Sequence, residues 1–411
     1  SACDGRPLQR SARFEHRFDM SPAMLVILFW CCAAMVVYVY AGYPLLAAWL
    51  ARRFGRLTEP RPLDDEQLPA ISLLVAAHNE ESVIRQRLEN ALAMDYPTDK
   101  LEIVVASDGS TDRTAAIVKQ FGGRGVRLLD FHDRRGKASV LNAAVASLRG
   151  GIVLLSDANT FLDPSAARRL VRWFADDRIG VVCGRLVLSD PQTGQNVDSL
   201  YWKYETFIKK CEARLGALLG ANGAIYALRR EEYQPIPGDT IVDDMVIPLL
   251  AYLRTGCRTV YDAQAVAYEE TPPRIASEFR RRARIGAGGF QSLARLWRLL
   301  DPRRGWIALA FLSHKVLRWL CPFFLLGLLA ANLLLLDQPL YRLLLAAQLM
   351  FYAVSAAGTF LPGSAPLVRL IRATTMFSSM NLALLVGFAR WLTGRQRGAW
   401  QRTARPSPLL P

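Results

Sequence analysis

The sequence predicts an α/β domain attached to membrane-spanning α-helices, because two different patterns divide the chain. Between residues 66 and 275, short apolar runs such as ISLLVAA and LEIVVAS alternate with segments of helical period. Continuous apolar strands separated by helices are typical of a Rossmann-like, mostly parallel sheet with helices on both faces. Elsewhere, long apolar stretches carry few or no charges, and hydrophobic residues make up 52% of the chain. Such stretches are long enough to cross a bilayer.

Four segments are candidates for membrane-spanning helices. They are residues 23–50, 319–336, 343–361 and 373–389. The first is expected to remain as an anchor, because no small-residue cleavage site follows it. Arg52, Arg53 and Arg56 follow it directly, so the positive-inside rule places the middle domain, residues 66–275, in the cytoplasm. The sequence therefore predicts an integral protein of the cell inner membrane with its middle domain in the cytoplasm.

Three further segments complete the expected organisation. Residues 1–22 form an N-terminal segment, residues 276–318 form interfacial helices with an arginine motif, and residues 390–411 form a basic tail. Lys315 and Arg318 lie at helical spacing among apolar residues, which suits an interfacial helix whose cationic side chains reach lipid phosphates. Four spans would leave the tail outside, whereas its arginines favour the cytoplasm, so the side of the tail stays open.

Polar clusters follow three of the expected strands at the points where these strands end. They are HNEE at 78–81, SDGSTD at 107–112 and SDANT at 156–160. In parallel α/β sheets the ligand crevice lies at the carboxyl ends of the strands, so this placement indicates an enzyme site. No GxxxxGK[ST] or GxGxxG loop follows a strand, which argues against a nucleotide triphosphatase or a dinucleotide oxidoreductase. The net charge of +15 suits a membrane surface or a phosphorylated substrate.

The acidic candidates each have a structural and a functional interpretation. Asp157 and Asn159 could hold a divalent cation that bridges a diphosphate, or they could form a polar turn. Asp244, beside Asp243 at the front of an apolar helical segment, suits either a general base or a helix cap. Asp108 in SDGSTD points either into the crevice or into an ordinary strand-to-helix turn.

The remaining candidates are small or cationic. Asn222 lies among small residues in GANGA, a composition that lets backbone approach a ligand closely or forms a plain turn before a strand. Arg280, Arg281, Arg282 and Arg284 lie in one helical segment. Guanidinium groups there can bind a pyrophosphate or attract lipid headgroups, and we prefer the lipid interpretation for Arg280 and Arg282.

In this order, the motifs resemble those of the family 2 glycosyltransferases. HNEE, SDGSTD, RRGKASVLN, SDANT, GANGA, VDD and the arginine segment each occur where that family has them, and the similarity covers roughly residues 24–405. The chain looks most like the membrane-embedded group of cellulose, hyaluronan, chitin-oligosaccharide and poly-N-acetylglucosamine synthases. The resemblance implies an inverting enzyme with a GT-A fold, a nucleotide-sugar donor that is usually UDP-linked, and Mg²⁺ or Mn²⁺.

The resemblance also implies a role for each candidate residue. The nucleotide-binding residues would be Glu80, Asp108, Lys137, Arg281 and Arg284. Asp157 and Asn159 would occupy the metal-binding positions. Asn222 and Gly223 would form the floor under the acceptor, and Asp244 would be the catalytic base that deprotonates the acceptor hydroxyl.

Two positions depart from the family pattern. Asn159 replaces the second carboxylate of the metal motif, so we expect metal to be held chiefly through Asp157. The QxxRW motif of processive synthases reads RRARI here, which puts Ile285 where an aromatic floor for the acceptor sugar is expected. Tyr201 or Trp202 could supply an aromatic surface instead.

The sequence therefore predicts a membrane-bound, polysaccharide-synthase-like transferase that adds sugar to a growing glycan. A transferase that adds one sugar to a lipid-linked acceptor and an inactive transferase-fold scaffold are the alternatives. Expected partners are a nucleotide sugar, a glycan or lipid-linked acceptor and membrane lipids, and an export partner stays open. Nucleic acid is not expected, because the middle region has no basic face with interleaved aromatic residues.

Overall fold

The computed structural model describes residues 21–56, 60, 62–189, 200–270, 275–361 and 365–396. Most of the expected N-terminal segment and residues 397–411 of the basic tail lie outside these ranges. The sheet has eight strands in the order β3-β2-β1-β4-β7-β6-β8-β5. The strands are β1 Ile71–Ala77, β2 Leu101–Asp108, β3 Val126–Phe131, β4 Ile152–Asp157, β5 Phe161–Leu162, β6 Ile179–Ser189, β7 Tyr226–Arg229 and β8 Arg258–Glu270.

The sheet is mostly parallel, as the strand pattern predicts. Strands β3, β2, β1 and β4 pair in parallel, and β6 pairs in parallel with β8. Strand β7 is antiparallel to both β4 and β6, and β5 is antiparallel to β8. The antiparallel β7 therefore separates the parallel half of the sheet from the β6–β8 pair and brings the loop before β7 to the carboxyl end of β4.

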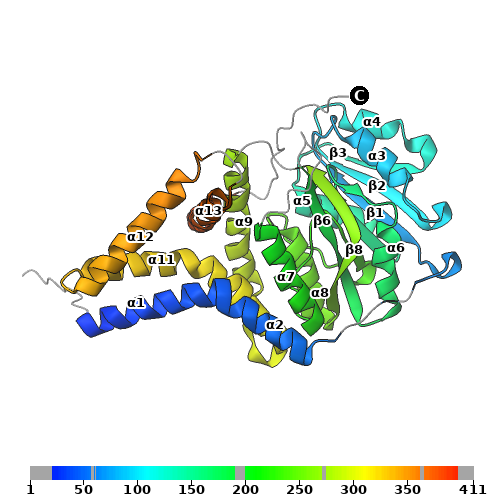
Figure 1. Cartoon of the computed structure of the whole chain (residues 1–411). Coiled ribbons are helices and arrows are strands. Elements are labelled where there is room, and N and C mark those ends of the chain that lie inside the picture. Colours follow the sequence, from blue (N-terminus) through cyan, green and yellow to red (C-terminus); the bar gives the residue numbers. More distant parts are fainter. Residues whose placement is uncertain are drawn as a thin grey trace, which may run out of the picture.

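Helices cover both faces of the sheet (Figure 1). They are α3 Ile84–Leu92, α4 Thr114–Lys119, α5 Lys137–Ala146, α6 Ala166–Val171, α7 Leu200–Leu215 and α8 Asp243–Thr255. Every residue of β1 is buried. Leu73 and Val75 belong to one apolar core, and Leu74 and Ala76 belong to the other. Successive side chains of a strand point to opposite faces, so this continuous apolar run is explained by two covered faces.

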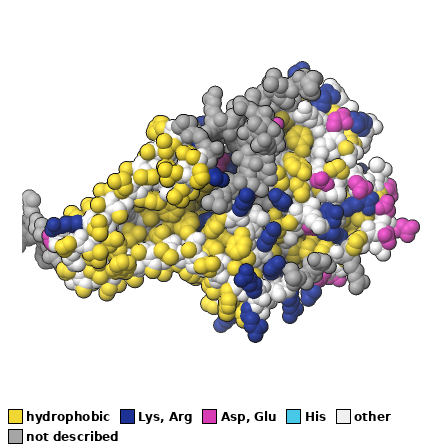
Figure 2. All heavy atoms as spheres, in the orientation of Figure 1, with side chains coloured by type: hydrophobic (Ala, Val, Ile, Leu, Met, Phe, Trp, Pro, Cys, Tyr) yellow, Lys and Arg dark blue, Asp and Glu magenta, His cyan; other side chains and the backbone are white. Residues whose placement is uncertain are grey.

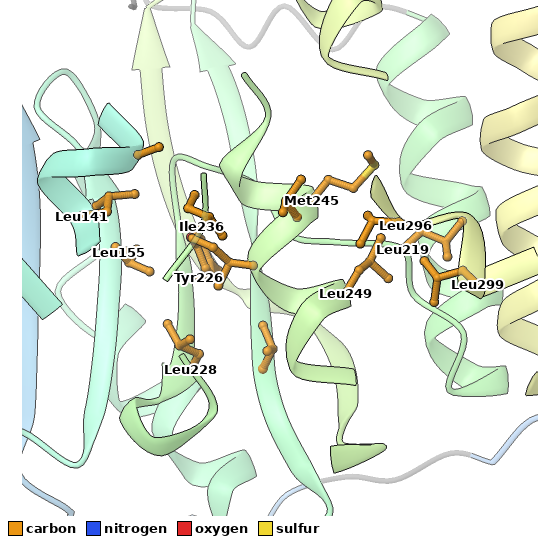
Figure 3. Close-up of a cluster of buried hydrophobic side chains, with 14 of the residues drawn as sticks. Leu141, Leu155, Leu219, Tyr226, Leu228, Ile236, Met245, Leu249, Leu296 and Leu299 are labelled. Carbon is orange, nitrogen blue, oxygen red and sulfur yellow. The ribbon is translucent and has the colours of Figure 1, made fainter. Parts of the chain in front are cut away.

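One of the two cores extends beyond the sheet domain. Figure 3 shows Tyr226 of β7 beside Met245 and Leu249 of α8, with Leu296 and Leu299 beyond them. Leu296 and Leu299 are fully buried and follow α9, Ile275–Arg295, which leads into the membrane helices. The sheet domain and the helical segments that follow α9 therefore share one continuous apolar core.

Four long helical segments are apolar enough to cross a membrane by length and composition: Pro22–Phe54, Trp306–Leu334, Pro339–Ala357 and Pro366–Leu392. They contain α1 Pro22–Val37, α2 Tyr43–Phe54, α10 Trp306–Ala310, α11 Leu317–Leu334, α12 Pro339–Ala357 and α13 Pro366–Leu392. In Figure 1, α1, α11 and α12 form an arm that extends away from the sheet. Figure 2 shows hydrophobic side chains over this arm, and Lys and Arg side chains gather where it meets the domain.

The helices differ from expectation in one respect. The last part of the expected interfacial segment, from Trp306, is continuous with α11, so that one helical segment extends from Trp306 to Leu334. Two π-helical turns interrupt the regular α-helices, at Tyr38–Gly42 between α1 and α2 and at Phe311–Val316 between α10 and α11. Such turns are rare and often lie at functional sites.

A close contact between the ends of two strands gives a test of this packing. A Cβ atom added at Gly150 would lie 2.5 Å from backbone atoms of Ile71 and Ser72. Gly150→Ala should therefore push β4 away from β1 and lower the free energy of unfolding by about 1–3 kcal/mol. Gly151→Ala is the matched control, because nothing lies within 4 Å of a Cβ atom there. Equal thermal unfolding midpoints for the two variants would contradict the described packing.

Candidate active site

A cavity of about 370 Å³ lies at the carboxyl edge of the sheet. Nine of the ten residues that the sequence indicates line this one cavity. These nine residues are Glu80, Lys137, Asp157, Asn159, Asn222, Gly223, Asp244, Arg281 and Arg284. They come from six separate segments of the chain, which the sheet topology and the packing of α9 bring together.

A buried lysine lies between carboxylates from two of these segments. Lys137 begins α5, and its Nζ lies 2.9 Å from Oδ1 of Asp157 and 3.2 Å from Oδ2 of Asp243. Burial by itself lowers the pKa of Lys137, but the two carboxylates outweigh burial and raise it. The ammonium group therefore stays charged and holds the end of β4 next to the start of α8.

Asp108 is the exception among the ten residues. It is only 2% exposed and does not line the cavity. Its Oδ1 accepts a hydrogen bond from the backbone N–H of Arg135, and its Oδ2 accepts one from the N–H of Gly136 at 3.0 Å. Gly136 has φ of +85° and directly precedes Lys137. In this structure Asp108 therefore fixes the loop that places Lys137, rather than facing the cavity.

The two carboxylates that the sequence assigns to metal and base face the same point. From an ideal Cβ position on Gly223, Oδ2 of Asp244 lies at 3.5 Å and Oδ2 of Asp157 at 3.8 Å. The backbone N–H of Gly223 donates to Oδ2 of Asp244 at 3.2 Å. Burial, followed by the like charge of Asp243, raises the pKa of Asp244, while Lys137 and Lys209 act against the rise. A carboxylate with a raised pKa is a better proton acceptor.

Two arginines of α9 line the cavity. Arg281 makes paired hydrogen bonds to Glu278 of its own helix, at 3.0 and 3.2 Å. Arg284 donates to the backbone carbonyl of Ile241. Burial lowers the pKa of Arg284, and the carboxylates of Asp243 and Asp244 oppose this. Arg282 also bonds to Glu278, at 2.7 Å, and does not line the cavity.

The residues around Asp157 fit a divalent cation only in part. Oδ1 of Asp157 is bonded to Lys137, and the side-chain amide of Asn159 donates to Glu269 at 2.6 Å. In the ranges that the structure describes, no group of three or more His, Cys, Asp and Glu side chains could hold a metal. Oxygen atoms of Asp157 and Asn159 can supply part of a coordination shell. Mg²⁺ sites of this kind use one or two carboxylates and complete the shell with substrate phosphates and water.

Further residues line the cavity besides those that the sequence assigns to the nucleotide, the metal, the acceptor floor and the base. Asp243 shares the N-terminal turn of α8 with Asp244, Glu269 lies at the end of β8, and Trp202 of α7 lines the cavity. The placement of Glu269 at a strand end could have indicated it. Trp202 is one of the two aromatic residues proposed to replace the motif aromatic, while the side chain of Tyr201 lies outside the described residues. Ile285 lines the cavity and is 40% exposed.

A second cavity, of about 420 Å³, lies near the opposite edge of the sheet and is lined by Arg229 and Arg230. The guanidinium group of Arg229 donates to the backbone carbonyls of Ile179 and Phe174, and that of Arg230 donates to the carbonyl of Leu148. This cavity is larger than the first by volume, but its two arginines bind backbone carbonyls and Glu231 is the one acidic residue among its described lining residues. The first cavity contains both the acidic and the cationic residues that the sequence motifs indicate.

Comparison with known proteins shows which family the middle of the chain is similar to. The profile of Glycosyl transferase family 2 matches residues 72–233. The poly-beta-1,6-N-acetyl-D-glucosamine synthase of Staphylococcus aureus is 26% identical over 252 residues, which cover 58% of this chain and 59% of the synthase. The synthase of Staphylococcus epidermidis is 25% identical over 255 residues, which cover 59% of this chain and 60% of that protein. The chain therefore matches about three fifths of the length of these curated relatives.

A solved structure has the same fold over nearly the whole chain. The mannosyltransferase PcManGT from Pyrobaculum calidifontis, in complex with GDP-Man and Mn²⁺, has a TM-score of 0.70 at 23% identity. The likeness covers 91% of this chain and 99% of that one. Residues 72–233 match the family 2 glycosyltransferases, the chain is similar to poly-N-acetylglucosamine synthases over about three fifths of its length, and it has the GT-A fold, as the sequence motifs predict.

The support that Asp108 gives to the loop before Lys137 can be tested without any ligand. Asp108→Asn keeps the volume but replaces an acceptor oxygen with an amide that faces backbone N–H donors. We expect the free energy of unfolding to fall by about 1–3 kcal/mol, measured by thermal unfolding of the nucleotide-free protein. Asp133→Asn, at an exposed position in the same loop, should leave the midpoint unchanged. A stable Asp108→Asn variant would show that these hydrogen bonds do not hold the loop.

Proposed function

We propose that the chain is a membrane-bound, inverting glycosyltransferase that moves a sugar from a UDP-linked donor to a hydroxyl group of a growing glycan. The observation that carries the proposal is the convergence of Asp157 and Asp244 on one cavity that Lys137 and Arg284 also line. The names of the staphylococcal relatives support a glycan product. The arginines that follow the first span support a cytoplasmic position for the cavity, at the inner membrane.

The donor side of the proposed site is cationic. Arg284 and Arg281 lie where they can bind the diphosphate, and Lys137 forms an ion pair with Asp157 in the same cavity. A bound Mg²⁺ or Mn²⁺ would neutralise charge that develops on the leaving diphosphate. Asp157 and Asn159 are the protein residues that would hold the ion, chiefly Asp157, because Asn159 replaces the second carboxylate of the metal motif. The Mn²⁺ in the complex of the mannosyltransferase supports a divalent cation.

The acceptor side contains the base and an aromatic surface. The N–H of Gly223 holds Oδ2 of Asp244, which leaves Oδ1 to take the proton from the acceptor hydroxyl. The hydroxyl oxygen then bonds to the anomeric carbon as the bond to the diphosphate breaks, with inversion at that carbon. Trp202 offers a ring on which an acceptor sugar can stack. It would take over the role of the aromatic residue of the QxxRW motif, whose position is occupied by Ile285 here. This aromatic surface favours a glycan acceptor over a single lipid-linked sugar.

Turnover against a panel of nucleotide sugars tests the proposal. Purified protein with Mn²⁺ should release nucleoside diphosphate from a UDP-sugar, and the glycan product should carry several added residues. Asp244→Asn should lower kcat by about 10²- to 10⁴-fold, because it removes the general base. Asp99→Asn, on the exposed surface at the start of β2, is the control. A product with a single added sugar would favour the lipid-linked alternative. If the protein with Asp244→Asn still performs its function in the cell, the scaffold alternative would be favoured.

The incomplete set of protein ligands makes a prediction about metal binding. Because one oxygen of Asp157 is bonded to Lys137 and Asn159 is neutral, Mn²⁺ should bind weakly to the protein alone. Addition of UDP should tighten Mn²⁺ binding by roughly tenfold or more, since the diphosphate supplies further ligands. Titration followed by the electron paramagnetic resonance signal of free Mn²⁺ measures this. Tight binding of Mn²⁺ without nucleotide would contradict the ligand set.

A further inference from the structure

One face of helix α7, Leu200–Leu215, carries one aromatic and three charged side chains in a row. Trp202, Glu205, Lys209 and Glu212 are separated by three, four and three residues, which is the spacing of one helix face. Trp202 lines the active-site cavity. Glu205 and Glu212 are 8% and 1% exposed, so two carboxylates lie buried on this helix. Buried charges are retained only when they are paired and hydrogen-bonded.

The two glutamates pair with residues of the membrane-spanning segments. Glu212 accepts hydrogen bonds from Oη of Tyr43 in α2 and pairs with Nδ1 of His314, each at 2.7 Å. Glu205 pairs with Arg318 of α11, and its Oε2 lies 3.5 Å from Nε2 of His314. Burial opposes ionisation of Glu205, but Arg318 and His314 outweigh it and hold its pKa well below the usual value. The sequence suggests that Arg318 extends to lipid headgroups. In the structure Arg318 instead binds Glu205 of α7, which belongs to the sheet domain.

The same region joins the two π-helical turns to each other. Oη of Tyr38 and Oγ of Ser313 lie 2.8 Å apart. Tyr204 of α7 donates to the carbonyl oxygen of Tyr40, and Arg318 lies over the rings of both Tyr40 and Tyr204. Both interruptions of the membrane helices thus lie against α7. A π-helical turn changes the direction of side chains along a helix, and here it places polar side chains where α7 needs partners.

Lys209, in the middle of the stripe, reaches the active site. Its Nζ donates to Oδ1 of Asn222, whose Nδ2 donates to the carbonyl oxygen of Gly184 at 2.7 Å. Asn222 directly precedes Gly223, whose N–H holds Asp244. Ala221 donates its N–H to the backbone carbonyl of Asp244 at 2.8 Å. The loop under the acceptor side is therefore held by α8 on one side and by α7, through Lys209, on the other.

We propose that α7 is the element through which the membrane helices fix the acceptor side of the active site, with Lys209 as the positioning residue that acts through Asn222 and Gly223 on Asp244. The inference rests on the proposed function in that Asp244 is the base. The donor side depends on the loop before Lys137 and on α9, so loss of Lys209 should affect catalysis and leave nucleotide binding intact.

The first test is independent of turnover. Hydrogen–deuterium exchange of the full-length protein should be faster at residues 219–225 in Lys209→Met, and unchanged at residues 133–137. Lys209→Arg should restore slow exchange, because it keeps a cationic donor. Lys210→Met is the matched control, since Lys210 is the adjacent residue of the same helix and is exposed. Exchange at 219–225 that is equal in Lys209→Met and in the unaltered protein would overturn the inference.

The second test connects the link to catalysis. With a UDP-sugar and Mn²⁺, Lys209→Met should lower kcat by roughly tenfold or more, while the Kd of UDP by calorimetry changes less than about twofold. Lys209→Arg should recover most of kcat. This recovery would show that the loss in Lys209→Met does not come from misfolding. An equal loss of UDP binding, or no loss of kcat, would overturn the positioning role. If the unaltered protein releases no diphosphate while exchange responds as expected, the proposed function fails and the structural link stands.

A third variant pair tests the membrane end of the link. Glu205→Gln and Arg318→Gln should each speed exchange at residues 219–225. The double variant should exchange no faster than the faster of the two single variants, because each substitution removes the same Glu205–Arg318 ion pair. Additive effects of the two substitutions would show that the pair does not act as a unit and would overturn this part of the inference.

Discussion

The active site depends on one buried cation held between two carboxylates. Lys137 contacts Asp157 at the end of β4 and Asp243 at the start of α8, two elements separated by more than eighty residues of sequence. Without the ammonium group, the carboxylates of Asp157, Asp243 and Asp244 would face one another in a confined space, and their repulsion would push β4 and α8 apart. The lysine allows the acidic groups proposed for metal and base to share one cavity.

The sheet topology explains why these residues meet. Because β7 runs antiparallel between β4 and β6, the loop that enters it lies at the same edge as the carboxyl end of β4. That loop contains Asn222 and Gly223. Asp108 lies two strands away from Asp157 and contributes indirectly, since it fixes the backbone before Lys137. Asp108, at the end of β2, therefore acts on the site through the hydrogen bonds that its carboxylate accepts from the backbone N–H groups of Arg135 and Gly136.

The sequence predicts the parallel sheet and the position of most candidate residues, because apolar strands and the polar residues after them follow simple rules. It does not predict that Asp108 turns away from the cavity, because a carboxylate at a strand end suits a ligand and a loop equally well. It also assigns Arg318 to lipid headgroups. Its actual partner, Glu205, lies 113 residues earlier in sequence, and no local pattern indicates a pairing over that separation. Long-range ion pairs of this kind become visible only in the folded chain.

The most direct measurement is a structure of the full chain with UDP and Mn²⁺ bound. The account predicts the diphosphate between Asp157 and Arg284, the ion against Asp157, and Asp244 facing the open space on the other side of Gly223. Nucleotide in the cavity beside Arg229 and Arg230, with the carboxylates around Lys137 left without ligand, would contradict it.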